Sequence, residues 1–325
     1  MTSLFMDFLN WINGWVGNYG WSIVLFTLFV RLVLLPLDIK SKKSMRATQK
    51  IQPKLNALQK KYANDKEKLN AKTMELYRKE HVSPTAGCLP MLIQLPLLFI
   101  MFAAMRTVGN EHTIRMILDI KDGAEPVLQG WLWIKNVFQP DSFGATILPA
   151  VNDQLLTIAE SQHSTILTAE NIAAAKEFLA SAEYAQIAAG YGTGAFIQFT
   201  LNLLIVRPVI TLPSSFANLM QYANGLFILP LLAGASQFLM TKLSSIDQPQ
   251  PQPGDKPNGM NSGFMKWFFP IFSVYICASS NAAFSIYWMA ANVIQIVQQL
   301  VINTYFKKQD EKEAAAAAQA EANKI

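Results

Sequence analysis

An arginine interrupts an otherwise apolar stretch near the start of the chain. The segment SIVLFTLFVRLVLLPLDIK, residues 22–40, has the composition of a membrane span, yet it contains Arg31. A guanidinium stays protonated at every accessible pH, so placing it in hydrocarbon is costly. Charged side chains within spans almost always face the interior of a helix bundle or a water-filled cavity. We therefore expect Arg31 to line a hydrated groove, where it can hold acidic groups without covalent chemistry.

Other polar residues within apolar segments predict which side chains share this groove. Thr27 lies one helical turn before Arg31, which places both residues on one face of a helix. The later apolar segments contribute three more candidates, Gln94, Gln237 and Asn292. Two plainer interpretations of Arg31 stay open: it pairs with Asp38 further along the same helix, or it thins the bilayer locally.

Residue types that support catalysis or proton transfer are missing from these apolar segments. Asp and Glu do not occur inside the later four, and the three histidines, His81, His112 and His163, fall in the loops between them. The two cysteines, Cys88 and Cys277, form no CxxC motif. We therefore expect no enzymatic activity, no metal site and no cofactor. A proton-coupled carrier is also disfavoured, because such proteins keep ionisable relays within their spans.

The elements that must position these residues are membrane-spanning helices. Of the 325 residues, 51% are hydrophobic and only 15% are charged, and residues 267–306 contain no charge. A helical span needs about 20 mostly apolar residues. Five segments meet this requirement: 19–38, 88–106, 225–242, 265–281 and 283–304. We predict an all-α, polytopic membrane protein with five transmembrane helices around a hydrophilic groove, together with a cytosolic helical hairpin.

The distribution of charge between the spans predicts their orientation. The loop 39–83 contains 13 Lys and Arg residues against 4 acidic residues, whereas the loop 107–224 contains 5 basic and 10 acidic residues. An excess of Lys and Arg marks the cytoplasmic side of a membrane. We expect the first loop inside, the second loop outside, the N-terminus outside and the C-terminus in the cytoplasm.

The basic loop 39–83 is expected to form the helical hairpin. Apolar residues recur every three or four positions on both sides of a break at Asn64-Asp65. Pro53 removes a backbone hydrogen bond from the first arm, so we expect a kink or a new helix at this residue. The basic surface suits anionic lipids or ribosomal phosphates. The hairpin contains no base-reading motif, so we expect no sequence-specific nucleic-acid binding; a solvated hairpin without a partner is the alternative.

The remaining segments are an N-terminal interfacial helix, an extracytoplasmic region, a cytosolic linker and a cytosolic tail, at residues 1–18, 107–224, 243–264 and 305–325. The first lacks the basic start and cleavage site of a signal peptide, so we expect it to be retained; a disordered tag is the alternative. Residues 195–206 are apolar, but Arg207-Pro208 interrupts them. We expect an interfacial or re-entrant helix there rather than a sixth span.

Four blocks of the sequence together resemble a known family. They are WSIVLFTLFVRLVLLPLDIKSKKSMRATQKIQPKLNALQKKY, GCLPMLIQLPLLFIMF, ILPLLAGASQFLMTKL and MKWFFPIFSVYICASSNAAFSIYWMAANVIQIVQQLVIN, at residues 21–62, 87–102, 228–243 and 265–303. Their order, their spacing and short motifs such as QPKL and VQQ are similar to those of the YidC/Oxa/Alb membrane protein insertases. Within this family the chain resembles the bacterial five-span form.

The resemblance implies roles for individual residues. In the family, a single arginine stands in a hydrophilic groove that opens to the cytosol and to lipid, and Arg31 occupies the matching position. Thr27, Tyr287 and Trp288 match the positions that contact substrate in the first and last spans, and Gln94 matches a polar groove position. The implied function is to insert nascent proteins into the bacterial plasma membrane and to help them fold.

The resemblance also implies partners, and the sequence departs from the family at two places. Nascent membrane proteins, the ribosome and the Sec translocon are implied partners, and we expect the monomer to be active. The tail EKEAAAAAQAEANKI is nearly neutral, whereas the family's basic tail helps to bind ribosomes. An insert at about 150–224 precedes the third span, where the family passes almost directly into that span.

Two other functions stay open for this sequence. One is a carrier or channel for small anions with Arg31 as the anion site, although the sequence lacks the repeated, broken helices of many carriers. The other is a subunit that only scaffolds other membrane proteins.

Overall fold

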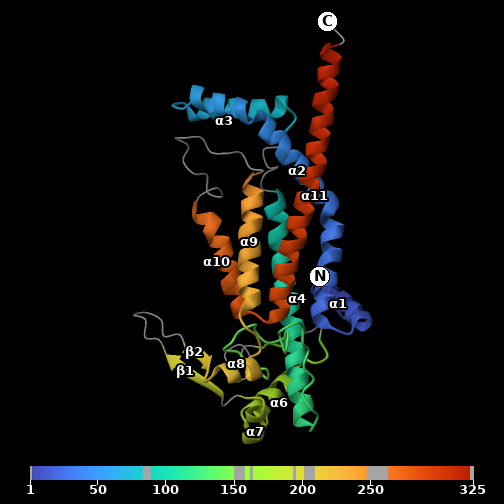
Figure 1. Ribbon diagram of the computed structural model, residues 1–325, viewed down its shortest axis with the longest axis vertical. Coiled ribbons are helices and arrows are strands. Elements are labelled where there is room, and N and C mark those ends of the chain that lie inside the picture. Colours follow the sequence, from blue (N-terminus) through green and yellow to red (C-terminus); the bar gives the residue numbers. More distant parts are fainter. Residues whose placement is uncertain are drawn as a thin grey trace. The chain divides into compact units, whose positions relative to one another are not determined.

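The chain is mainly helical in the computed structural model, which describes residues 2–82, 89–149, 158–161, 164–192, 195–200, 209–246 and 263–322. The helices are α1 (Thr2–Val16), α2 (Tyr19–Lys61), α3 (Lys66–Lys79), α4 (Leu89–Lys121), α6 (Ala169–Leu179), α7 (Ala182–Gly190), α8 (Phe216–Tyr222), α9 (Ile228–Ile246), α10 (Gly263–Ser279) and α11 (Ala282–Ala322) (Figure 1). Two short strands, β1 (Phe196–Thr200) and β2 (Val209–Pro213), are the only strands in these described ranges. The helical class predicted from the sequence is therefore correct, with this small sheet as an exception.

Residue contacts divide the chain into two compact units. Unit 1 comprises Met1–Thr27, Leu95–Ala235 and Phe269–Ala290. Unit 2 comprises Leu28–Gln94, Ser236–Phe268 and Ala291–Ile325. The helices α2, α4, α9, α10 and α11 each contribute residues to both units.

Helix α2 contains both the first predicted span and the first arm of the basic loop without interruption. It begins after Gly17, whose φ of 69° ends α1, and the side chain of Asn18 accepts a hydrogen bond from the backbone N–H of Trp21 at 3.2 Å. Pro53 lies inside α2, so no new helix begins at this residue, and the kink stays a prediction. Ile51 and Leu55 flank Pro53 and are buried, and such packing stabilises a helix beyond its local propensity.

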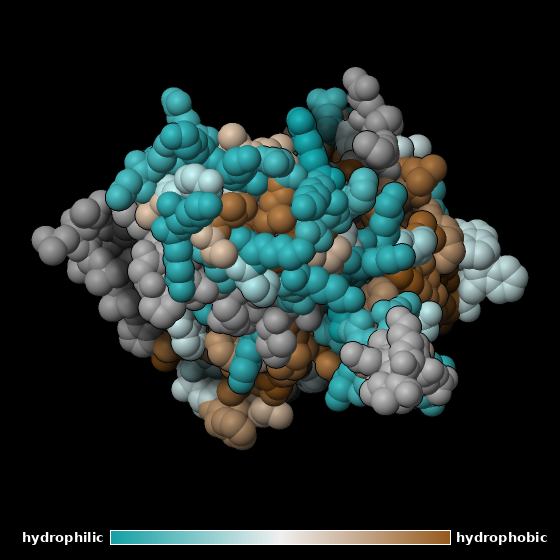
Figure 2. Space-filling view, turned by 90° about the horizontal axis from the view of Figure 1, so that it is seen from above, coloured by the Kyte–Doolittle hydropathy of each residue, from teal (hydrophilic) through white to brown (hydrophobic). Residues whose placement is uncertain are grey.

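The rest of the basic loop forms α3, which begins at the predicted break. Asp65 caps this helix by accepting a hydrogen bond from the backbone N–H of Lys68 at 3.0 Å. A small apolar cluster joins the two helices: Ile51, Leu55 and Val82 are buried, and Leu76 and Tyr77 pack against them. Seen from above, the side of unit 2 near α3 is mostly hydrophilic, with apolar residues visible between the polar side chains (Figure 2).

Within unit 2, α11 packs on the second half of α2 through residues near the end of its apolar stretch. Arg46 of α2 lies 3.2 Å from the carboxylate of Asp310 and 5.0 Å from the centre of the Phe306 ring. Phe306 is buried, so the contact combines an ion pair with apolar packing. The predicted tail at 305–325 therefore begins as a continuation of the α11 helix, which ends at Ala322.

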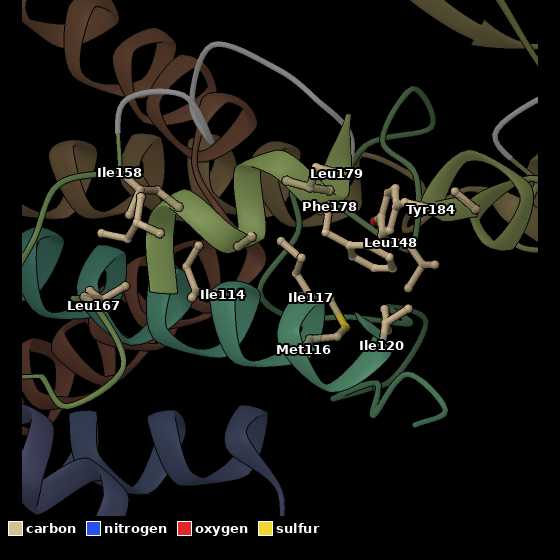
Figure 3. Packing of buried hydrophobic residues seen from close by; sticks show 13 residues of the cluster. Ile114, Met116, Ile117, Ile120, Leu148, Ile158, Leu167, Phe178, Leu179 and Tyr184 are labelled. Carbon is tan, nitrogen blue, oxygen red and sulfur yellow. The ribbon is translucent and has the colours of Figure 1, made fainter. Parts of the chain in front are cut away.

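Helix α4 extends well beyond the predicted span at 88–106, because its second half belongs to an apolar core in unit 1. This core joins α4 to α6 and α7 (Figures 1 and 3). Figure 3 shows Ile117 and Ile120 of α4 directed toward Phe178 and Tyr184. Burying each such side chain contributes about 1.5–3 kcal/mol, which explains why the helix continues to Lys121.

In the described parts of the insert, polar side chains mark the starts of the helices α6 and α7. Thr168 caps α6 and Ser181 caps α7, each through a side-chain oxygen that accepts a backbone N–H two or three residues into the helix. The hydroxyl of Tyr184 donates a hydrogen bond to the carbonyl of Pro149 at 2.6 Å. Burial raises the pKa of Tyr184, which keeps this hydroxyl protonated as the donor.

The helix expected at 195–206 is replaced by strand β1. This strand pairs antiparallel with β2, with Phe196 opposite Pro213 and Thr200 opposite Val209. The sequences FIQFT and VITLP are rich in aromatic and β-branched residues, which favour strands. The helix prediction was wrong because a short apolar run carries too little periodicity to distinguish a strand from a helix; residues 201–206 lie outside the described chain.

The other predicted spans coincide with helices of somewhat different length. The segments 225–242, 265–281 and 283–304 fall largely on α9, α10 and α11, and most of the predicted linker 243–264 lies outside the described residues. Among the described helices, α2 and the part of α11 at Ala282–Ala316 are long and apolar enough to cross a membrane. The N-terminal segment forms α1, in which Met6, Leu9 and Ile12 are buried while Trp11 and Trp15 are exposed.

Candidate functional site

Arg31 is directed into the protein although it lies on an apolar helix. Its exposed fraction is 3%, whereas Leu32 and Val33, the next residues of α2, are 53% and 60% exposed. The outer face of α2 in unit 2 is therefore apolar, and the charged side chain lies on the opposite face. Arg31 is therefore directed away from the exposed apolar side chains that follow it in α2.

Polar side chains of α9 and α11 accompany Arg31 in unit 2. The side-chain amide of Gln298 donates a hydrogen bond to the backbone carbonyl of Arg31 at 3.1 Å. Asn292 of α11 donates to the hydroxyl of Ser236 of α9 at 3.1 Å, and both side chains are buried. Buried polar groups are stable only when they have such partners. These contacts tie α11 to α2 and to α9 within one unit.

The other two unit 2 candidates are Gln237 of α9 and Gln94 of α4. Gln237 is half-buried, and its backbone carbonyl accepts a hydrogen bond from the hydroxyl of Thr241 at 2.9 Å. Gln94 lies within α4, in the stretch whose side chains are not described.

The remaining three candidates, Thr27, Tyr287 and Trp288, belong to unit 1 and are buried. The hydroxyl of Thr27 donates to the carbonyl of Ile23 at 2.6 Å, one turn back in α2. Tyr287 and Trp288 lie beside the ring of Phe284, with ring centres 6.3 Å and 5.6 Å from it. The indole N–H of Trp288 is buried without a hydrogen-bond partner in the described part of the chain. A buried donor without a partner is costly, so it marks a position where a bound acceptor would be favourable.

The sequence analysis missed Asp141, which holds the start of α9. Its carboxylate accepts hydrogen bonds from the backbone N–H groups of Phe227 at 3.0 Å and Leu229 at 2.6 Å, and from the indole of Trp133 at 3.4 Å. Asp141 is 0% exposed. A negative charge at a helix N-terminus satisfies unpaired N–H groups and interacts favourably with the helix dipole. Asp141 therefore positions the helix that carries Ser236 and Gln237.

The sequence analysis also missed Asn224 and Lys135, which join the end of the insert to the segment before Asp141. Asn224 accepts a hydrogen bond from the backbone N–H of Asn136 at 2.8 Å and donates to the carbonyls of Asn136 and Pro140, both at 2.9 Å. The amine of Lys135 donates to the carbonyls of Met220, Gln221 and Ala223 near the end of α8. The only sequence signal for these contacts is the presence of polar residues in the block WLWIKNVFQPD. The sequence does not show their partners, because these lie far along the chain.

His112 contributes a pH-dependent element to unit 1. It stacks on Phe138, with ring centres 4.2 Å apart, and its edge meets Tyr19 at 4.6 Å. Burial, with a smaller contribution from Arg115, lowers the pKa of His112 from 6.5 to about 4. Since the unfolded chain binds a proton near pH 6.5 and the folded chain does not, stability is constant above that pH and falls as the pH drops toward 4.

We therefore expect the unfolding temperature of the purified protein to fall between pH 6.5 and pH 4, and His112→Phe to reduce this fall. Phenylalanine keeps the stacking on Phe138 but cannot become charged. Circular dichroism during heating measures the effect, and His81→Gln, in exposed His81 of unit 2, serves as the matched histidine control. An identical pH dependence in the wild type and in His112→Phe contradicts this role.

Comparisons with known proteins identify the family of the chain. The model of the family described as 60Kd inner membrane protein matches residues 11–310. A membrane protein insertase YidC from Fusobacterium nucleatum is 42% identical over 144 residues, which are 44% of this chain and 62% of the relative. Proteins of the same name from Campylobacter jejuni and Leptospira interrogans are 25% and 26% identical over 96% and 92% of this chain.

The chain spans less than two thirds of the length of these relatives: 62%, 39% and 33% of the proteins from Fusobacterium, Campylobacter and Leptospira. The family match nevertheless includes α2, α4, α9 and α10, the first part of α11 and the region 107–224. Because it extends over nearly the whole sequence, this chain belongs to the 60Kd inner membrane protein family.

Proposed function

We propose that this protein inserts nascent proteins into the bacterial plasma membrane and helps them to fold, using Arg31 to receive a hydrophilic part of the client. Two observations support the proposal: the family whose matched relatives are named membrane protein insertases, and the burial of Arg31 at 3% exposure. The burial of Arg31 is the observation on which the mechanism depends. A cation enclosed in a bundle of apolar helices attracts acidic groups that would otherwise remain in water.

The physical role of the site is to lower the cost of moving polar groups through hydrocarbon. A carboxylate or a backbone carbonyl of the client exchanges water for the guanidinium and the neighbouring amides of Gln298 and Asn292. Charge-assisted hydrogen bonds of this kind are stronger than neutral ones, and no bond of the client is broken. Because Arg31 is almost fully buried, the client reaches it only when the surrounding side chains separate.

We place the five helices α2, α4, α9, α10 and α11 across the membrane, with the N-terminus outside and the C-terminus in the cytoplasm. Helix α10 has 17 residues and is about 26 Å long, against a hydrocarbon core of about 30 Å. Such a mismatch thins the bilayer and shortens the path of a client. The same argument does not apply to α4, which has 33 residues.

Unit 2 also provides a basic surface for partners on the cytoplasmic side. Lys54 and Glu80 form an ion pair between α2 and the end of α3, and Lys50, Lys68 and Lys72 also pair with acidic side chains. Lys60 and Lys66 form no ion pair within the described residues, so they are available to phosphates. We propose anionic lipids and the ribosome as partners of this surface, through sequence-independent contacts. The Sec translocon is a further proposed partner, and we propose that a single copy of the chain is active.

Site-specific photocrosslinking tests whether the client passes these residues. A photoreactive phenylalanine analogue at Trp288 or at Thr27 is expected to crosslink to a stalled, radiolabelled nascent chain with a single span. Because Trp288 is already aromatic, its replacement changes the local volume little. The same analogue at Val33, 60% exposed on the outer face of α2, is the control and is expected to crosslink chiefly to lipid.

Equal crosslinking from Val33 and Trp288 contradicts passage through a defined site and favours a scaffolding subunit. Absence of crosslinks from both Trp288 and Thr27, while the nascent chain still inserts, overturns the proposed path.

A further inference from the structure

Three polar side chains on one face of α4 line a pocket within unit 1. Arg106, Asn110 and Thr113 follow one another at the spacing of successive helical turns, so they share a face. The pocket has a volume of about 230 Å³. A water molecule occupies roughly 30 Å³ in the liquid, so the pocket has room for a phosphate with part of a glycerol.

These three side chains are hydrogen-bond donors that are available to a ligand. Within the described ranges, no ion pair involves Arg106, and no side-chain hydrogen bond involves Asn110 or Thr113. Arg106 is exposed, whereas Thr113 is 6% exposed at the inner end of the row. A guanidinium, an amide and a hydroxyl in one row suit a ligand that presents several acceptor oxygens with negative charge.

The opposite wall of the pocket is built by the turn between α10 and α11, which lies beside α4 (Figure 1). Asn281 in this turn donates a hydrogen bond to the carbonyl of Met105 at 3.2 Å and accepts one from the backbone N–H of Phe284 at 3.0 Å. Gly109 permits the close approach, because a Cβ there would lie 2.3 Å from Nδ2 of Asn281. The wall is therefore held in place without a ligand.

The pocket lies where three apolar helical segments end together. Arg106 is the first charged residue after the uncharged residues 82–105, and the α10–α11 turn divides the uncharged residues 267–306. Phe102, Ile276 and Phe284 form an apolar part of the lining. Arginines and small polar residues beside an apolar wall are typical of the boundary between hydrocarbon and headgroups.

We infer that this pocket binds the phosphate of an anionic phospholipid of the outer leaflet. Arg106 contacts the phosphate, Asn110 and Thr113 donate to its oxygens or to the adjoining glycerol, and the start of an acyl chain lies along Phe102 and Ile276. Such a lipid would contact both α4 and the α10–α11 turn at the surface of the protein. The inference requires a membrane location but does not depend on insertase activity or on Arg31.

Native mass spectrometry of the purified full chain tests the inference. Phosphatidylglycerol is titrated into the protein in detergent, and the occupancy of the first bound lipid is measured. We expect Arg106→Gln to weaken this binding by about tenfold, the loss of one charge-assisted hydrogen bond, and Arg106→Lys to restore part of it. Asn110→Ala removes a donor without changing the charge and is expected to weaken binding less. If Arg106→Gln does not fold, Asn110→Ala provides the test.

The matched control is Arg115→Gln, which removes an exposed arginine from the same helix outside the pocket. Equal lipid affinity in the wild type, Arg106→Gln and Asn110→Ala overturns the inference, as does an equal loss in Arg115→Gln. Competition with inorganic phosphate separates the two possible sources of the anion. Displacement of the lipid by millimolar phosphate assigns the pocket to a free anion instead.

Discussion

Replacing Arg31 with glutamate is expected to reduce the insertion of a client with an acidic N-terminal tail by at least about tenfold, the factor that 1.4 kcal/mol represents. The substitution turns attraction of the tail into repulsion within a region where water screens charges weakly. Arg31→Ala, which removes the attraction only, is expected to be less harmful. Arg31→Lys keeps the charge but loses the planar fork of donors, so it should retain most of the activity.

The measurement is protection of the client tail from added protease after insertion into vesicles that contain the purified protein. Lys121→Glu is the matched control, because it makes the same change of charge at an exposed position outside the basic hairpin, at the end of α4. A client with a neutral tail is expected to respond much less to the substitutions at Arg31. The amount and the unfolding temperature of each variant are measured alongside, so that a loss of folding is recognised.

Equal insertion of the acidic client by all four forms of residue 31 contradicts the electrostatic role. Saturable flux of a small anion through vesicles with the wild type, abolished in Arg31→Ala, would instead support the anion carrier or channel.

Removal of the Asp141 carboxylate is expected to cause the largest loss of stability. Asp141→Ala leaves the half-buried backbone N–H of Phe227 and the buried one of Leu229 without their acceptor, at the start of α9. Each buried group that loses its partner costs about 1–3 kcal/mol, so we expect a loss of about 3 kcal/mol for the two together. For a folding unit of this size, that corresponds to a fall of roughly 6–12 °C in the unfolding temperature.

Thermal unfolding followed by circular dichroism checks this prediction, with limited proteolysis of the extracytoplasmic region as a second measurement. Asp122→Ala is the matched control, since Asp122 is exposed and its side chain lies at the end of α4. The prediction is wrong if the two alanine variants unfold within 2 °C of each other.

The sequence was sufficient for features that depend on local composition. The apolar runs predicted the helices α2, α4, α9, α10 and α11, and Asn64-Asp65 predicted the start of α3, because periodicity and capping are properties of short segments. The choice of Arg31 as the central residue also required only the sequence, since a charge within an apolar run is conspicuous. The family followed from four blocks, and the comparison over residues 11–310 confirms it.

Other features were decided by contacts between distant segments, which composition does not contain. The apolar residues at 196–200 became a strand because β2 supplies their hydrogen-bond partners. Helix α4 continues to Lys121 because α6 and α7 bury its second half, and α2 passes through Pro53 beside a buried cluster. In each case, burial or pairing outweighed the local preference on which the prediction depended.

The sequence by itself therefore determined the helical class, the family and the residue whose charge is central to the proposed function. Only the tertiary structure revealed that Arg31 is buried rather than facing outward, that Gln298 binds its backbone, and that Asp141 holds the start of α9. The reason is physical: side-chain type and spacing are local, whereas burial and hydrogen-bond partners depend on segments that lie up to 267 residues apart in the chain.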